Sequence, residues 1–185
     1  MKYSPLIYLF AFPCLFASTI TFSGTDGSLD FDTVTGSHTL SGLEITLSAN
    51  DGVINATSSG GLGINDSVSG DDTDGIDSTN TIEILTISFD QDVIFNSLDL
   101  ANFGASDSLD LTFGGGATIH LTNTSPRTFD TFLSSSETLT IAAGAGSNGV
   151  NITNLHVTLA NAVPEPSTAV LALSGIAILF AHRKR

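Results

Sequence analysis

The stretch Ile82-Glu83-Ile84-Leu85-Thr86-Ile87-Ser88-Phe89 predicts a β-strand in the centre of a sheet. Successive side chains of a strand point to opposite faces, so residues at even positions in this stretch oppose those at odd positions. Both sets are mostly apolar and rich in isoleucine, which is typical of a strand that is covered on both faces. We therefore expect a fold built around a β-sheet.

Other segments show the alternation of a strand with one buried face. From Leu43 to Ser48, apolar side chains at odd positions alternate with polar side chains at even positions. Clusters of Gly, Ser, Asn and Asp separate such segments, and no helical periodicity occurs between residues 19 and 162. The pattern predicts an all-β fold, an antiparallel β-sandwich of jelly-roll-like topology. The further strands that we expect are Ile20–Ser23, Ser28–Val34, His38–Ala49, Val53–Thr57, Val93–Asn102, Ser108–Phe113, Thr118–Thr122, Thr138–Ala142 and Val150–Leu159.

Residues 1–18 have the three parts of a secretory signal peptide. Lys2 supplies a positive charge, and the apolar segment from Pro5 to Phe16 is too short to span a membrane. Small or apolar residues precede the expected cleavage after Ala17. These features predict a signal helix at the N-terminus and export through the Sec machinery.

The C-terminal residues 163–185 form a second signal of three ordered parts. Val163-Pro164-Glu165-Pro166-Ser167 is held extended because each proline fixes its own φ and restricts the residue before it. An apolar segment, Ala169 to Ala181, predicts a short hydrophobic helix, and Arg183-Lys184-Arg185 ends the chain with positive charge. A helix of that length covers roughly 20 Å, against about 30 Å of hydrocarbon in a bilayer. The segment therefore favours a transient anchor over a lasting span.

This ordered tail resembles the PEP-CTERM sorting signal of Gram-negative bacteria. Val163 to Ser167 is similar to its VPEP-type motif, and Arg183 to Arg185 is similar to its basic end. The resemblance implies recognition by exosortase, a membrane-embedded protease that is thought to cleave at the motif. It also implies transient anchoring in the inner membrane, followed by release to the cell surface or the extracellular matrix.

The remaining residues, 19–162, are long enough for one domain, and this domain is strongly acidic. It contains eighteen of the nineteen Asp and Glu residues, but Arg127 is its only Lys or Arg. Such a surface disfavours nucleic acid and anionic membranes as partners and favours cations. Cys14, the only cysteine, is lost with the signal peptide, so the domain is expected to fold without a disulfide.

An acidic loop is expected between Ser58 and Thr81, and it suggests a calcium site. Ca²⁺ is bound by six to eight oxygen atoms from carboxylates and carbonyls. The alternative is a loop whose acids are merely solvated. A resemblance to a pattern in extracellular domains of PEP-CTERM proteins, carried by Gly61–Asn65, Asp74–Asp77 and Glu83–Asp90, implies that Asp77 and Glu83 belong to one structural unit. The candidate ligands are Asp66, Asp72, Asp74, Asp77 and Glu83.

The sequence contains no catalytic motif between the two signals. Three single histidines on expected strands lack metal-ligand spacing, and no Gly-x-Ser-x-Gly segment occurs. We expect Arg127 to pair with a nearby acid. The expected function is thus a non-catalytic structural or binding role at the cell surface or in an exopolysaccharide matrix. The alternative is a carbohydrate-binding module or a polysaccharide-active enzyme, although residues 19–162 contain neither Trp nor Tyr for stacking on sugars.

Overall fold

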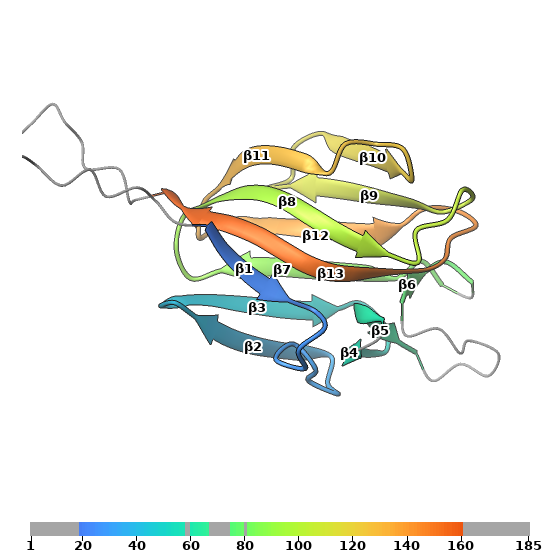
Figure 1. The fold of residues 1–185 in the computed structure, drawn as a ribbon, viewed down its shortest axis with the longest axis horizontal. Coiled ribbons are helices and arrows are strands. Elements are labelled where there is room, and N and C mark those ends of the chain that lie inside the picture. The colour runs from blue at the N-terminus through green and yellow to red at the C-terminus, as the bar shows by residue number, and fades with distance from the viewer. Residues whose placement is uncertain (1–18, 58–59, 67–74, 80, 161–185) are drawn as a thin grey trace, which may run out of the picture. The chain divides into compact units, whose positions relative to one another are not determined.

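The computed structural model describes residues 19–57, 60–66, 75–79 and 81–160 (Figure 1). These residues form thirteen strands and no α-helix, which confirms the all-β class. The expected signal helix and the expected C-terminal helix lie outside the described residues. The strands are β1 (Thr19–Ser23), β2 (Thr35–Leu40), β3 (Leu43–Ala49), β4 (Val53–Thr57), β5 (Gly61–Asn65), β6 (Ile76–Asp77), β7 (Ile84–Phe89), β8 (Val93–Ala101), β9 (Ser108–Phe113), β10 (Thr118–Thr122), β11 (Thr128–Leu133), β12 (Thr138–Ala143) and β13 (Asn148–Leu159).

The strands form two antiparallel sheets. The seven-stranded sheet, here called sheet A, has the order β11-β8-β13-β5-β4, and β1 and β6 also pair with β13. The six-stranded sheet, here called sheet B, has the order β10-β9-β12-β7-β3-β2. As the sequence predicts, β7 is central in its sheet, because it pairs with β12 on one side and β3 on the other.

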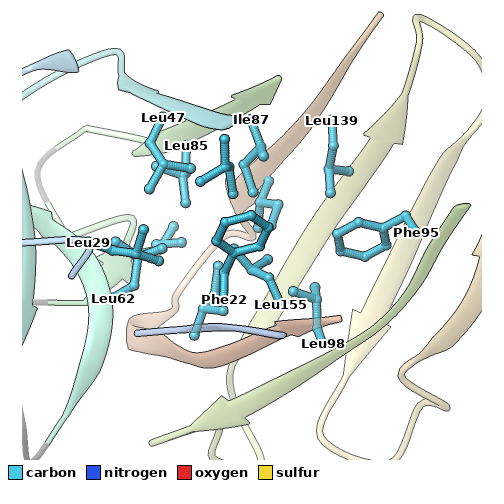
Figure 2. Close-up of a cluster of buried hydrophobic side chains, with 14 of the residues drawn as sticks. Phe22, Leu29, Leu47, Leu62, Leu85, Ile87, Phe95, Leu98, Leu139 and Leu155 are labelled. Atoms are coloured by element: carbon cyan, nitrogen blue, oxygen red, sulfur yellow. The ribbon is translucent and has the colours of Figure 1, made fainter. Parts of the chain in front are cut away.

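One hydrophobic core joins the inner faces of the two sheets in a sandwich-like arrangement. In Figure 2, Leu47, Leu85, Ile87 and Leu139 of sheet B face Phe22, Leu62, Leu98 and Leu155 of sheet A. The alternation in β3 decides its orientation, since its apolar side chains at odd positions are buried and its polar ones are half-buried. Burial of such a side chain stabilises a fold by about 1.5–3 kcal/mol, so this alternation orients each strand.

Strand β13 is the main support of sheet A. It has β8 along one side and β1 and β5 on the other, and its first residues pair with β6. Ile152, Leu155 and Val157 are fully buried. Two register shifts against β8 let the strand bend while these side chains stay in the core.

The segment His38–Ala49, expected as one strand, is a hairpin of β2 and β3. Ser41 and Gly42 form its two-residue turn, with φ of 54° and 82°. Two consecutive positive φ values are the mark of the tight turn that matches the twist of paired strands. The expectation was wrong because serine seldom adopts a positive φ, so Ser41-Gly42 is a weak turn signal by sequence alone.

The expected strand Ser28–Val34 is also wrong. The chain turns there, since the backbone N–H of Asp30 donates to the carbonyl of Gly27 and Asp32 has a φ of 49°. Leu29 is nevertheless fully buried and packs into the core beside Leu62 (Figure 2). Because Leu29 must be apolar to be buried, the segment has the sequence pattern of a strand although its backbone turns.

Two further differences concern β5, β6 and β11. The expected loop Ser58–Thr81 contains β5, which pairs with β4 and β13, and the short β6. Strand β11 was not expected, because a bulge at Asp130 breaks its alternation and leaves Phe129 and Phe132 three positions apart. In both places, pairing with neighbouring strands determines the structure, and the local sequence pattern does not predict it.

Candidate functional site

Buried polar side chains gather at one end of the sheets, here called the loop end. In Figure 1 this is the right-hand end, where β6 and the β8–β9 and β12–β13 connections lie. Four of these side chains are carboxylates, although a buried charge is costly unless hydrogen bonds compensate it. The buried polar residues of the described chain are Asp66, Asp77, Glu83, Asp107, Ser147 and Asn151.

Glu83 and Asp77 hold the β6–β7 connection closed. The backbone N–H of Asp77 donates to Oε2 of Glu83 at 2.9 Å, and the N–H of Glu83 donates to the carbonyl of Asp77 at 3.0 Å. Oδ1 of Asp77 accepts the N–H of Thr79 at 2.8 Å. Both side chains are only 1% exposed. The two acids thus belong to one structural unit, and their described contacts are those of a loop clamp.

A second set of contacts fastens the β12–β13 connection to its neighbours. Oγ of Ser147 donates to the carbonyl of Ser108 at 2.8 Å and accepts the N–H of Ser108 at 3.0 Å. The N–H of Ser78 donates to the carbonyl of Ser147, so the β6–β7 connection joins the same network. Asp107 adds a bridge, because its carboxylate accepts the N–H groups of Gly104 and Asn148. Sequence reasoning missed Asp107, which stands between strands and outside any alternating pattern.

The candidate calcium ligands are only partly brought together. Asp77 and Glu83 meet, and Asp66 directly follows β5, whose Ile64 N–H donates to the carbonyl of Gly75 just before β6. Asp72 and Asp74 lie outside the described residues. Within the described ranges, no three His, Cys, Asp or Glu residues are grouped as a metal site. The carboxylates of Asp77, Glu83 and Asp107 instead accept hydrogen bonds from backbone N–H groups, the usual means of compensating a buried carboxylate.

The outer face of sheet A carries a hydroxyl, an imidazole and a carboxylate in contact. Thr21 and His156 are directly opposed on β1 and β13, with Oγ1 and Nδ1 2.9 Å apart. Nε2 of His156 lies 3.0 Å from Oδ2 of Asp99 on β8. Because a carboxylate can only accept, Nε2 carries the proton, and in the neutral ring Nδ1 accepts from the Thr21 hydroxyl. The arrangement links three strands and polarises the hydroxyl, and alternation in the strands was the one signal that could have located it.

These contacts perturb Asp99. Hydrogen bonds from His156 and Asn154 hold the pKa of Asp99 below its ordinary value. The carboxylate thus favours its ionised form in the folded protein. Since the side chain is 54% exposed, solvent weakens the effect.

Replacement of Asp99 by Asn should lower the free energy of unfolding by less than about 1 kcal/mol at neutral pH. A depressed folded pKa gives stability that is present above the unfolded pKa of about 3.9 and is lost as pH falls through the folded pKa. The difference between wild type and Asp99→Asn should therefore vanish in acid. Urea denaturation over a pH series measures it, and a difference that persists undiminished at about pH 2 would contradict this account.

The outer face of sheet B is covered by hydroxyl groups in register. One row crosses all six strands, and neighbouring members lie about 4.8 Å apart across the sheet. Among the described residues of this row, Thr112 and Thr118 are joined by a hydrogen bond between their Oγ1 atoms, which are 2.9 Å apart. The others stand side by side as donors and acceptors for solvent or a partner. The row consists of Thr35, Ser48, Thr86, Thr140, Thr112 and Thr118.

The other candidates of the sequence have structural contacts. Nδ1 of His120 lies 2.7 Å from Oδ1 of Asp110 on the neighbouring strand, and the ring of His38 packs edge-on against Phe22. Arg127 makes no ion pair with a described carboxylate, contrary to expectation. Its guanidinium donates to the carbonyl of Leu100 and lies 5.3 Å from the centre of the Phe103 ring, a cation–π contact.

The sorting motif, the basic end and the signal peptide lie outside the described residues. The described part of the chain has no helix with the length and hydropathy needed to cross a membrane. Comparison of the chain with protein-family models, with curated proteins and with solved structures gave no significant match.

Proposed function

We propose that the chain is an exported protein of a Gram-negative bacterium whose β-domain has a structural or binding role at the cell surface or in an exopolysaccharide matrix. The observation that carries this proposal is the order of three signals in residues 163–185: the Pro164-Glu165-Pro166 tag, the short apolar segment and the basic end. In this proposal the Sec machinery exports the chain, and an exosortase-type protease cleaves the tail.

The proposed architecture of the domain is a jelly roll. Its first sheet has the order β5-β13-β8-β11 and its second the order β7-β12-β9-β10. The chain passes between these two sheets at β7–β8, β8–β9, β10–β11, β11–β12 and β12–β13, as two Greek keys require. Strands β2, β3 and β4 extend the edges. Jelly rolls occur in lectin and capsid domains, so the topology is compatible with binding or assembly.

The surface of the domain supports a structural or binding role. The hydroxyl row of sheet B offers donors and acceptors that match the hydroxyl groups of a polysaccharide. Its members are half-buried or exposed threonines and a serine, with no charge among them. Each of these residues would bind a hydrated polymer weakly, so the strength of binding would depend on how many residues take part.

The carbohydrate-binding alternative has less support. Stacking on a sugar ring requires an exposed aromatic side chain. Of the eight phenylalanines between residues 19 and 162, only Phe132 is exposed, at 56%. The other seven lie in the core or pack against it. For the enzyme alternative, the contact of Thr21, His156 and Asp99 is the group of described side chains with the most suitable chemistry, and it lies on a regular sheet face.

Calcium binding is a separate part of the proposal. Asp66, Asp77 and Glu83 lie near the ends of β5, β6 and β7, and Asp72 and Asp74 belong to the connection between β5 and β6. A metal that binds only the folded protein raises its melting temperature. Calcium should then stabilise the protein relative to chelator at constant ionic strength, and the absence of any shift would exclude the site.

Processing of the tail is tested by mass spectrometry of the protein purified from its host. The mature species should begin within a residue of Ser18 and should lack Ala169 to Arg185. Replacing both Pro164 and Pro166 with Ala removes the rigid tag and should leave the tail attached, whereas the control Thr168→Ser should be processed normally. Mature protein that ends at an intact Arg185 would refute the proposal.

A further inference from the structure

The two end strands in the order of sheet A, β4 and β11, are protected against pairing with another strand. Natural sheets block such pairing with covering segments, bulges or charges. At β4, the N–H of Ile54 donates to the carbonyl of Thr33 at 2.9 Å, and the N–H of Asp32 donates to the carbonyl of Ile54 at 3.0 Å. The chain before β2 therefore covers this edge.

The opposite edge of sheet A, β11, is protected in a different way. A bulge interrupts the strand, and Asp130 within it has a φ of 46°. The carboxylate of Asp130 accepts from the side chain of Asn96, so the charge is fixed at this edge. An added strand would meet an irregular backbone and a negative charge.

Within the described residues, the two edge strands of sheet B, β2 and β10, have no covering segment, bulge or edge charge of this kind. Strand β2 reads Thr-Gly-Ser-His-Thr-Leu and β10 reads Thr-Ile-His-Leu-Thr, without proline, lysine or a carboxylate. Each pairs in regular register with one described strand, β2 with β3 and β10 with β9. Half of the backbone groups of such an edge strand point away from its partner.

Apolar side chains are left uncovered at the same two edges. Leu40 of β2 is 36% exposed and Ile119 of β10 is 38% exposed. Each is paired with a buried leucine, Leu43 or Leu111, so each is on the core-facing side of sheet B. An added strand would extend the sheet and cover both.

The direction of the two edge strands identifies a partner. Sheet B has six strands in purely antiparallel order, so its first and last strands, β10 and β2, run in opposite directions. A second copy placed beside the first by simple translation thus brings its β10 antiparallel to β2. We infer that copies of this chain assemble head to tail through β2 and β10.

One register for this pairing keeps the polar side chains on the outer face of the extended sheet and the apolar side chains on its core-facing side. With Ser37 opposite His120 of the next copy, the outward threonines of the two strands face each other, and Ile119 lies beside His38 and diagonal to Leu40. The contact is heterologous and uses a different surface on each copy, so it propagates into an open-ended filament.

The charge of the domain sets the conditions for assembly. Eighteen acids against Arg127 make copies repel at low ionic strength. At about 0.1 M salt this repulsion is screened beyond about 10 Å, whereas backbone pairing is not weakened in the same way. Association should therefore strengthen as ionic strength rises. This inference goes beyond the proposed function, because it depends on two strands and not on the tail.

The test is sedimentation of the protein, expressed with both terminal signals in a Gram-negative host and purified as that host leaves it. Wild type should form oligomers larger than a dimer, and their size should increase with protein concentration and with salt concentration. Ile119→Lys and Leu40→Lys should each be monomeric when alone. Because Ile119→Lys keeps an intact β2 and Leu40→Lys an intact β10, their mixture should form a dimer and nothing larger.

Phe132→Lys is the matched control, since it places the same charge on an exposed apolar residue of the protected edge β11. It should assemble like wild type. Wild type that stays monomeric in all salt conditions, a mixture that stays monomeric, or an equal loss of assembly in Phe132→Lys would overturn the inference. The dimer in the mixture also shows that both variants fold.

Discussion

Glu83→Ala is expected to lower the free energy of unfolding by about 3 kcal/mol, and the melting temperature by roughly 10 °C. The carboxylate is 1% exposed, and its Oε2 accepts the N–H of Asp77. Truncation leaves this N–H buried without that acceptor, and such a loss costs more than the hydrogen bond itself contributes. Urea denaturation followed by circular dichroism measures the change.

Glu44→Ala is the matched control for this prediction. Glu44 stands at a half-buried position on the outer face of β3, so its truncation should change stability by no more than about 0.5 kcal/mol. A loss for Glu83→Ala that is the same in calcium and in chelator identifies a clamp that acts without metal. A similar small effect for both variants would contradict the role of Glu83 as a clamp.

Phe95→Ala is expected to cost about 4 kcal/mol. Phe95 is fully buried, and its ring lies 5.6 Å from that of Phe113 and 5.8 Å from that of Phe129. Phe113 and Phe129 are also 5.8 Å apart, so the three rings form a triangle that joins β8, β9 and β11. Removal of one ring creates a cavity and removes two ring contacts at once.

Thermal and urea denaturation check this effect against Phe132→Ala. Phe132 is on the same strand as Phe129 but is 56% exposed, so its truncation should cost less than about 0.5 kcal/mol. A loss of only about 1 kcal/mol for Phe95→Ala would mean that the neighbouring rings close the cavity. Such a result would contradict a tightly packed triangle.

Regular strands of the fold were predictable where alternation was uninterrupted. Val53–Thr57, Ser108–Phe113 and Thr118–Thr122 have the predicted bounds, because their inward side chains alone determine their orientation. Strand β5 was not predictable, since two of its five residues are glycines. Its Gly61 has a φ of 106°, and a Cβ there would meet the carbonyl of Ile152, so contact with β13 requires glycine.

The candidate site was predictable only in part. Asp77 and Glu83 lie at the two ends of one short connection and are joined by a hydrogen bond, so their closeness in sequence was the signal that could indicate their contact. Asp107 and the contact of Thr21 with His156 depend on segments distant in sequence, and alternation could indicate only that Thr21 and His156 each lie on a strand face. The sequence indicates which residues alternate, but not which strands become neighbours.

The pairing of β1 with β13 has a consequence for the time at which the protein can fold. Thr21 and His156 are opposed across the two strands although 135 positions separate them in the chain. Contacts of such separation form late and slow the search for the native state. Strand β1 must therefore wait for β13 before it can pair, so this part of sheet A closes only when nearly the whole of the described chain is available.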